Sequence, residues 1–180
     1  AHLYGDSEVR LGGAIAGRGG LSESGAATLT LNGAITYTGG TSVSGGTRAL
    51  GAGGSLAAGG GVALSAAGAG FDISGASGGQ TIGYLSGVAG TNLTLGGNAL
   101  TFGDASNRSF DGTITGSAGL VKNGAGVQEL GGANTFGGGV TLNAGGLSVG
   151  NNAALGVGAL TVVGNGTLDS TGPITLANNV

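Results

Sequence analysis

A serine framed by glycines is the first candidate for chemistry in this chain. Gly75-Ala76-Ser77-Gly78-Gly79 matches the G-x-S-x-G pattern that places a serine nucleophile on a sharp turn between a strand and a helix. Such a serine needs a histidine base and an acid to orient that base, and the sequence contains one histidine, His2. Because 47 of the 180 residues are glycine, the pattern arises by chance, and we expect a turn here with no catalytic residue.

The spacing Gly68-x-Gly70-x-Asp72 resembles half of a calcium-binding nonapeptide repeat. Calcium takes six or more oxygen ligands, so that site needs tandem copies whose carboxylates come from neighbouring repeats. The motif occurs once, and its counterpart near Asp169 lacks the spacing. We therefore expect no metal, and we expect Asp72 and Asp169 to lie at equivalent turns that face solvent.

Asp104, Arg108 and Asp111 form the densest group of charges in the sequence. Glycan cleavage would need two carboxylates held on opposite sides of a groove, and a single loop does not readily supply both. The interpretation that we favour is a solvated corner closed by local hydrogen bonds. No phosphate-binding loop and no other cofactor motif is present in the sequence.

Two further groups of residues have a structural and a functional interpretation. Tyr37 and Phe136 follow threonine in alternating stretches. An outward row of such aromatic rings could stack on sugars, but the alternation favours packing in the core. The three Asn-x-Ser/Thr sequons, at Asn92, Asn107 and Asn165, are expected by chance in this composition.

The elements that must position these residues are short strands followed by glycine turns. Aliphatic or β-branched residues alternate with polar ones between Gly, Asn and Asp, which is typical of strands and turns. Such stretches span residues 28–31, 62–64, 92–95, 99–102, 140–142, 147–149, 160–163 and 174–176. Helices are disfavoured, since each glycine inside a helix costs about 1 kcal/mol relative to alanine; residues 151–155 could form a single turn.

Self-similarity decides how the strands are arranged. Residues 15–51 align without a gap to residues 114–150 at a shift of 99, with 14 of 37 positions identical. We place the internal repeats at approximately 15–75 and 114–172, within one β-helical segment over residues 1–180. A parallel β-helix with coils of about 20 residues would give about eight or nine coils, with Ala, Val, Leu and Ile inside and Thr, Ser and Asn outside. A β-sandwich is the alternative.

Composition excludes several classes of partner. The net charge is −3, and the five cations are scattered singly, so no basic face for nucleic acid or anionic lipid can form. Every apolar stretch is interrupted well short of the roughly 18 residues that a membrane-spanning helix needs, so we expect no membrane insertion by this segment. Cysteine is absent, which excludes disulfides and thiolate metal sites.

Residues 119–147, "GLVKNGAGVQELGGANTFGGGVTLNAGGL", resemble the passenger-associated repeats of bacterial autotransporters almost position by position. Residues 20–46 are similar but looser, with Glu23 where the family usually has lysine. The stretches 82–87 and 92–98 resemble the segment that often precedes such a repeat. The resemblance implies an all-β fold, a right-handed parallel β-helix, in a fragment of a longer passenger. It also implies a Gram-negative surface or secreted protein of the type V pathway, exported by a C-terminal outer-membrane barrel.

Together these observations predict a non-enzymatic structural stalk that serves adhesion or cell–cell aggregation. Its expected partners are receptors or glycans on host or neighbouring cells, with self-association possible, because long polar faces suit many weak contacts. Two alternatives stay open. The segment could be the scaffold of a passenger whose enzymatic module lies elsewhere, or it could be a filament subunit that stacks through its strand edges.

Overall fold

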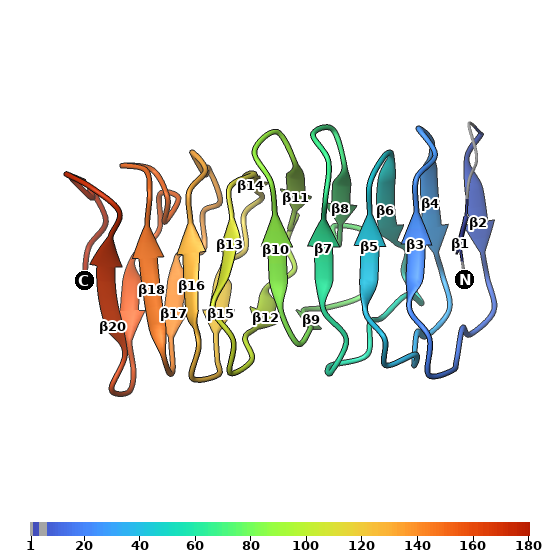
Figure 1. Ribbon diagram of the computed structural model, residues 1–180, viewed down its shortest axis with the longest axis horizontal. Helices are drawn as coiled ribbons and strands as arrows, with labels where there is room; N and C mark the ends of the chain where they lie inside the picture. The colour runs from blue at the N-terminus through green and yellow to red at the C-terminus, as the bar shows by residue number, and fades with distance from the viewer. Residues whose placement is uncertain (1, 4–6) are drawn as a thin grey trace.

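The chain folds as a parallel β-helix of about eight coils, each coil being one full circuit of the chain around the axis. The computed structural model describes residues 2–3 and 7–180, and this part contains strands and turns but no helix. Every strand pairing is parallel. In Figure 1 the strands stand side by side along the long axis, with the two termini at opposite ends of the rod. The predicted fold class is confirmed.

The strands form three sheets along the rod. The nine-stranded sheet contains β1 (His2–Leu3), β3 (Leu21–Glu23), β5 (Thr41–Val43), β7 (Val62–Leu64), β10 (Leu85–Gly87), β13 (Arg108–Phe110), β16 (Val127–Leu130), β18 (Gly146–Val149) and β20 (Thr167–Ser170). The six-stranded sheet contains β2 (Val9–Leu11), β4 (Thr28–Leu31), β6 (Thr47–Leu50), β8 (Gly70–Asp72), β11 (Asn92–Thr94) and β14 (Thr113–Thr115). The five-stranded sheet contains β9 (Gln80–Thr81), β12 (Leu100–Phe102), β15 (Leu120–Lys122), β17 (Val140–Leu142) and β19 (Leu160–Val162).

The inside of the rod is a continuous column of buried side chains, most of them apolar. Alternate residues of each strand point inward, because successive side chains of a strand lie on opposite faces. In the six-stranded sheet the register places Leu29, Arg48, Phe71, Leu93 and Ile114 one above another, and all five are buried. The stacking of equivalent inward residues gives each coil a template in the coil before it, as expected for a solenoid.

The two similar stretches of sequence do not lie on the same side of the rod. Strand β3 belongs to the nine-stranded sheet, whereas its equivalent β15 belongs to the five-stranded sheet. Toward the N-terminus the third side is held by isolated bridges, Ile15–Ile35 and Ala34–Ser55, instead of a regular sheet. Toward the C-terminus the side of the six-stranded sheet lacks regular strands, because that sheet ends with β14.

Most predicted strands are present, and one prediction is wrong. Residues 174–176 form no strand. They lie against the turn at 151–155. There the Thr175 amide donates a hydrogen bond to the side-chain oxygen of Asn152 at 2.9 Å, and not to the backbone of a strand. The neighbouring coil therefore offers no ladder against which these residues could pair. The turn at 151–155 closes through a bond from the Ala154 amide to the Asn151 carbonyl at 3.0 Å.

Candidate functional site

The glycine-framed serine lies in a surface turn. Ser77 is exposed in the segment between β8 and β9. His2 lies in β1, the first strand of the nine-stranded sheet. Its Nε2 atom is 3.2 Å from the Ser24 hydroxyl oxygen. The structure does not bring Ser77 and His2 together. The nucleophile motif is therefore a surface turn, as the sequence predicts.

The residues of the calcium-like motif are held by local bonds within their own coil. Asp72 ends β8, and its Oδ1 accepts a hydrogen bond from the Ser74 amide at 2.8 Å. Asp169 lies inside β20 on a different sheet, where it is exposed. Both residues thus lie in strands, and the prediction of equivalent turn positions is wrong, because the two repeats occupy different faces. Across residues 2–3 and 7–180, no three acidic or histidine side chains gather closely enough to share a metal ion.

The predicted charged corner divides into two parts. Arg108 donates to Asp104 at 3.2 Å, and Asp104 also accepts from the Ser106 amide at 2.8 Å, which closes the corner locally as expected. Asp111 follows β13 at the other end of that strand and is exposed. Its carboxylate packs against Gly131, where an added methyl group would overlap the carboxylate oxygen. The three charges therefore do not converge on one groove.

The three sequons are all on the surface. Asn92, Asn107 and Asn165 are exposed. The Asn107 side-chain oxygen accepts a hydrogen bond from the Val127 amide at 2.9 Å, so this side chain joins two neighbouring coils.

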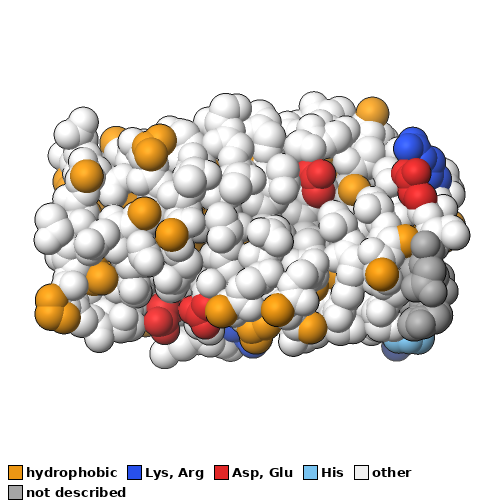
Figure 2. Space-filling view, turned by 90° about the horizontal axis from the view of Figure 1, so that it is seen from above, with side chains coloured by type: hydrophobic (Ala, Val, Ile, Leu, Met, Phe, Trp, Pro, Cys, Tyr) orange, Lys and Arg blue, Asp and Glu red, His pale blue; other side chains and the backbone are white. Residues whose placement is uncertain are grey.

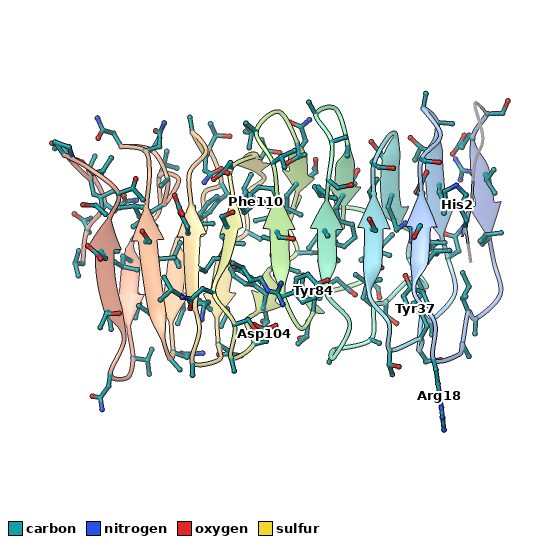
Figure 3. All side chains as sticks on the ribbon, viewed as in Figure 1. His2, Arg18, Tyr37, Tyr84, Asp104 and Phe110 are labelled. Atoms are coloured by element: carbon teal, nitrogen blue, oxygen red, sulfur yellow. The ribbon has the colours of Figure 1, made fainter. Side chains whose placement is uncertain are left out.

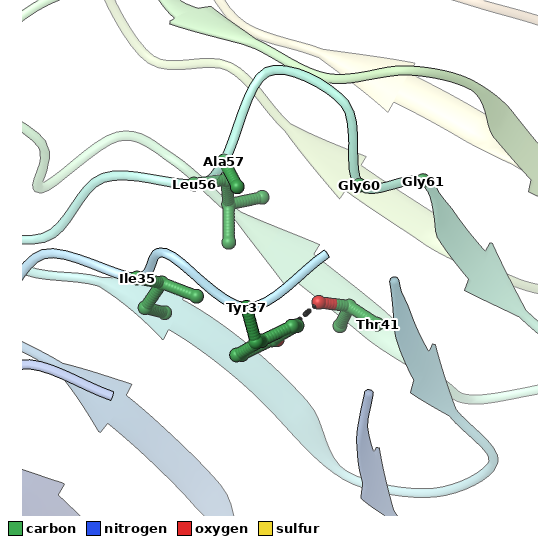
Figure 4. A pocket seen from close by; sticks show the side chains of 7 residues that line it. All are labelled: Ile35, Tyr37, Thr41, Leu56, Ala57, Gly60 and Gly61. Atoms are coloured by element: carbon green, nitrogen blue, oxygen red, sulfur yellow. Dashed lines mark hydrogen bonds between the residues drawn. The ribbon is translucent and has the colours of Figure 1, made fainter. Parts of the chain in front are cut away.

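The predicted core role of the two matched aromatic residues is confirmed. Tyr37 is 4% exposed and Phe136 is fully buried. Figure 4 shows the surroundings of Tyr37, whose hydroxyl is hydrogen-bonded to the Thr41 hydroxyl at 2.5 Å. The space beside the ring, lined by Ile35, Leu56 and the backbone at Gly60 and Gly61, has no room for a water molecule. It is packed core and not a ligand pocket.

A buried ion pair crosses the core near the N-terminal end. Arg48, from β6, reaches Glu23 of β3 with its Nη2 atom 3.1 Å and its Nε atom 3.4 Å from Oε2. The two side chains are 0% and 6% exposed. Burial raises the pKa of Glu23 above its ordinary value, and the Arg48 charge opposes that rise. The remaining nitrogen, Arg48 Nη1, is buried without a hydrogen-bond partner.

A second buried charge, Lys122 at the end of β15, is satisfied by the backbone. Its Nζ atom lies 2.6 Å from the carbonyl oxygen of Asn123, 3.1 Å from that of Gly124 and 2.8 Å from that of Gly126. Ala144 supplies a fourth oxygen from the next coil at 3.4 Å. Burial lowers the pKa of Lys122, and the nearby Asp104 charge opposes the shift. The ammonium group therefore fastens a turn and does not face a substrate.

Tyr84 is the described aromatic residue that stays partly exposed, and it lies on the outside of the nine-stranded sheet. Its ring rests on Gly61 of the neighbouring coil, where a methyl group would overlap the ring, and its hydroxyl reaches toward Gly40. The Arg108 guanidinium carbon lies 4.1 Å from the ring centroid, within the range of a cation–π contact. Figure 3 shows Tyr84 and Asp104 close together on the side of the rod that faces the viewer.

Two shallow hollows flank the Tyr84–Arg108 contact on the same sheet. One, of about 250 Å³, lies over the beginnings of β3, β5 and β7 and ends at Tyr84; it is lined by Ser22, Ser42, Ala63 and the glycines around them. The other, of about 390 Å³, extends from Arg108 across β16 and β18; it is lined by Asn107, Ser109, Val127, Glu129 and Ser148. This stretch is the part of the described surface where an aromatic ring, a cation, carboxylates and hydroxyls lie together.

The sequence contained a signal for part of this surface. Tyr84 precedes the inward Leu85, so alternation alone places it outside, whereas Tyr37 and Phe136 alternate inward. The Tyr84–Arg108 contact could not be found in this way, because it joins residues 24 positions apart through the register of β10 and β13. The burial of Glu23, Arg48 and Lys122 was missed as well, since charged residues are normally exposed.

Comparison with known families gives one match. The model of the passenger-associated-transport-repeat matches residues 22–47 and residues 120–149. The first range runs from the second residue of β3 to the first residue of β6, and the second contains β15 to β18. They include the buried charges at positions 23 and 122.

Among curated proteins, the chain is similar to the adhesin BmaC autotransporter of Brucella suis biovar 1 (strain 1330). The two are 35% identical over 98 residues, which cover 53% of this chain. The chain spans about 3% of the length of that relative. No solved structure matches the chain significantly. Among the described residues, none forms a helix with the length and apolarity needed to cross a bilayer.

Proposed function

Because the chain is a β-helical segment of an autotransporter passenger with passenger-associated transport repeats, we propose that it is a non-enzymatic stalk that serves adhesion or cell–cell aggregation. Passengers of this family are exported across the outer membrane to the cell surface. A rigid rod at that location holds its faces away from the cell. Its partners in this proposal are receptors or glycans on host or neighbouring cells, or other copies of the chain.

The observation that carries this proposal is the outer surface of the rod. The outward residues of the nine-stranded sheet stack in one column of small side chains, Ser22, Ser42, Ala63, Ser86 and Ser109, followed by Glu129 and Ser148. The five-stranded sheet has a similar column of Thr81, Thr101, Val121, Thr141 and Thr161. Figure 2, which views the rod from above, shows few charged side chains on that side, with apolar side chains scattered over it. Repeated weak contacts along such columns add up through multivalency.

Two further points support a non-enzymatic role. His2, the single histidine of the sequence, contacts Ser24 and not Ser77, and among the described residues no three acidic or histidine side chains cluster. The relative named above is an adhesin. A catalytic pocket would require convergent polar groups around a reacting atom, so these observations support a binding role.

The test uses beads coated with the purified chain. We expect them to attach to cultured epithelial cells or to aggregate with one another, and beads coated with albumin to do neither. A variant with Ser42, Ser86 and Ser109 each changed to lysine should lose attachment, because the charges disrupt the column on the nine-stranded sheet without entering the core. Wild-type beads that behave like albumin beads would contradict the proposal.

A further inference from the structure

We propose that the outer face of the nine-stranded sheet binds a neutral glycan chain along the rod axis, with Tyr84 and Arg108 at the centre of the site. This inference rests on the proposed adhesive function, and it adds a site and a ligand class to it.

The shape of the surface favours a long, thin ligand. The two hollows and the Tyr84–Arg108 contact lie over consecutive strands of one sheet, β3, β5, β7, β10, β13, β16 and β18. Neighbouring strands are about 4.8 Å apart, so this track is roughly 29 Å long. Both hollows are open to solvent along the sheet, and an oligosaccharide lying along the axis would contact each coil in turn.

The centre of the track is held in position before any ligand arrives. Gly61 leaves room for the Tyr84 ring to lie against the backbone. Asp104 holds the Arg108 guanidinium at 3.2 Å, above the ring. Arg108 Nε is shielded from solvent and has no hydrogen-bond partner. Groups fixed in this way lose little entropy when a ligand binds.

The chemistry along the track suits hydroxyl groups that both donate and accept hydrogen bonds. Arg108 and Asn107 supply donors, Glu129 supplies an acceptor, and Ser22, Ser42, Ser109 and Ser148 supply both. The carboxylates of Asp104 and Glu129 lie beside Arg108 here, and the nearby Lys122 ammonium group is buried and donates to backbone carbonyls, so the surface has no excess of exposed positive charge. That balance disfavours anionic glycans and nucleic acids, which need an excess of positive charge.

Other classes of partner fit this face less well. A peptide that adds a strand needs the free N–H and C=O groups of a sheet edge, and the strands beneath the track are paired on both sides. A lipid surface needs exposed apolar side chains. The large exposed ones of the described chain, Val9, Val88, Val157, Val162, Val163, Leu168 and Val180, line neither hollow.

The test is an NMR titration of the 15N-labelled full chain with three neutral probes, cellohexaose, maltohexaose and chitohexaose. Hyaluronan hexasaccharide serves as the anionic comparison. We expect at least one neutral probe to shift the amide signals of the nine-stranded sheet around Tyr84, Ser42 and Ser109, and hyaluronan to bind more weakly. Tyr84→Ala should weaken binding at least fivefold.

A second variant guards against a folding defect in Tyr84→Ala. Ser109→Arg places a bulky side chain in the hollow from an exposed position and should also weaken binding at least fivefold. The matched control Thr94→Arg adds the same charge to the six-stranded sheet, where it should leave binding unchanged.

Three outcomes would overturn the inference. They are no shift with any neutral probe at 10 mM, shifts centred on another sheet, and tighter binding of hyaluronan. Attachment of coated beads that survives Ser109→Arg would likewise reject this site, but it would leave the proposed adhesive function standing. If beads coated with the wild-type chain neither attach nor aggregate, the proposed function itself is contradicted.

Discussion

Positions 23 and 122 are equivalent in the two aligned stretches, and both side chains point into the core. The first is a glutamate, whose charge is met by the guanidinium of Arg48 across the interior. The second is a lysine, whose ammonium group donates to backbone carbonyls of the turn that follows it. Equivalent places in one architecture therefore bury opposite charges.

The comparison shows how a narrow β-helix tolerates a buried charge. A charge removed from water must be paired or hydrogen-bonded. The first region uses a side chain from another sheet, and its pair leaves Arg48 Nη1 without a partner. The second region uses only its own loop and the next coil, and the residue equivalent to Arg48 is the buried Leu147. The second arrangement is locally closed, whereas the first depends on two sheets remaining together.

The largest effect should come from breaking the ion pair. Arg48→Leu leaves Glu23 buried without its partner, and we expect the free energy of unfolding to fall by about 3–5 kcal/mol. The double variant Glu23→Lys with Arg48→Leu gives the first region the residues of the second and should recover most of that loss. Urea denaturation followed by circular dichroism measures both. A double variant as unstable as the single one would show that the carbonyls at 24–27 cannot replace those at 123–126.

The pH dependence of the same variant provides a second measurement. Since the pKa of Glu23 is raised in the folded protein, the folded state binds the proton more tightly than the unfolded state. The stability that this group contributes is complete below its ordinary value of 4.5 and is lost as the pH rises through the folded pKa. The Arg48 charge limits that loss in the wild-type chain. The difference in the free energy of unfolding between the wild type and Arg48→Leu should therefore grow as the pH rises above 4.5. A deficit that is constant between pH 4 and pH 8 would contradict this explanation.

The next effect concerns the second region. Lys122→Met removes the donor that serves the carbonyls of Asn123, Gly124 and Gly126. Hydrogen bonds that involve a charged group contribute about 1.5–3 kcal/mol, and we expect a loss of roughly 2–3 kcal/mol in urea denaturation. Hydrogen exchange should become faster in the turn at 123–126 and stay unchanged in the first region. Equal acceleration in both regions would argue against a locally closed site.

A smaller effect should separate two equivalent glycines. Gly40 and Gly139 both have positive φ, 80° and 73°, so alanine at either position would be strained by about 1–2 kcal/mol. An added methyl group would also overlap the Ala159 carbonyl oxygen at Gly139, whereas at Gly40 it would lie 3.3 Å from the Gly61 carbonyl. Thermal denaturation should therefore rank Gly139→Ala as the less stable variant. The reverse order would indicate that the backbone near Ala159 moves aside easily.

The smallest effect is expected at Gln128, which is equivalent to the buried Leu29. Its side-chain nitrogen donates to the Glu129 carbonyl at 3.0 Å. Gln128→Leu removes this bond and restores an apolar residue, and the two changes nearly cancel. We expect the midpoint of urea denaturation to shift by less than the equivalent of about 1 kcal/mol. A large loss would mean that the carbonyl of Glu129 depends on this donor.

The sequence was informative wherever a rule acts within a few residues. Alternation predicted the strand at 28–31 and the inward direction of Tyr37 and Phe136, and glycine turns indicated short strands. The same local rules gave a wrong strand at 174–176 and wrong turns for Asp72 and Asp169. Pairing with the neighbouring coil decides those positions, and alternation contains no information about that neighbour.

The candidate site was less predictable than the fold for the same reason. Tyr84 could be placed outside by alternation, but its support by Gly61 and its contact with Arg108 depend on which coils become neighbours. Asp104 and Arg108, four residues apart, were correctly expected to close a local corner. The participation of Asp111 could not be judged, because β13 carries it to the opposite end of the strand.

By itself, the sequence determined that this chain coils into parallel strands with an apolar interior, because period-two alternation and frequent glycine leave no helix and few other ways to bury Leu, Val, Ile and Phe. The tertiary structure decided which face each repeat occupies and how the buried charges are met. It also decided that the partly exposed Tyr84 ring lies between the two hollows of the nine-stranded sheet. Those features arise from stacking residues about 20 positions apart, and the register between coils is set by the packing of the whole core.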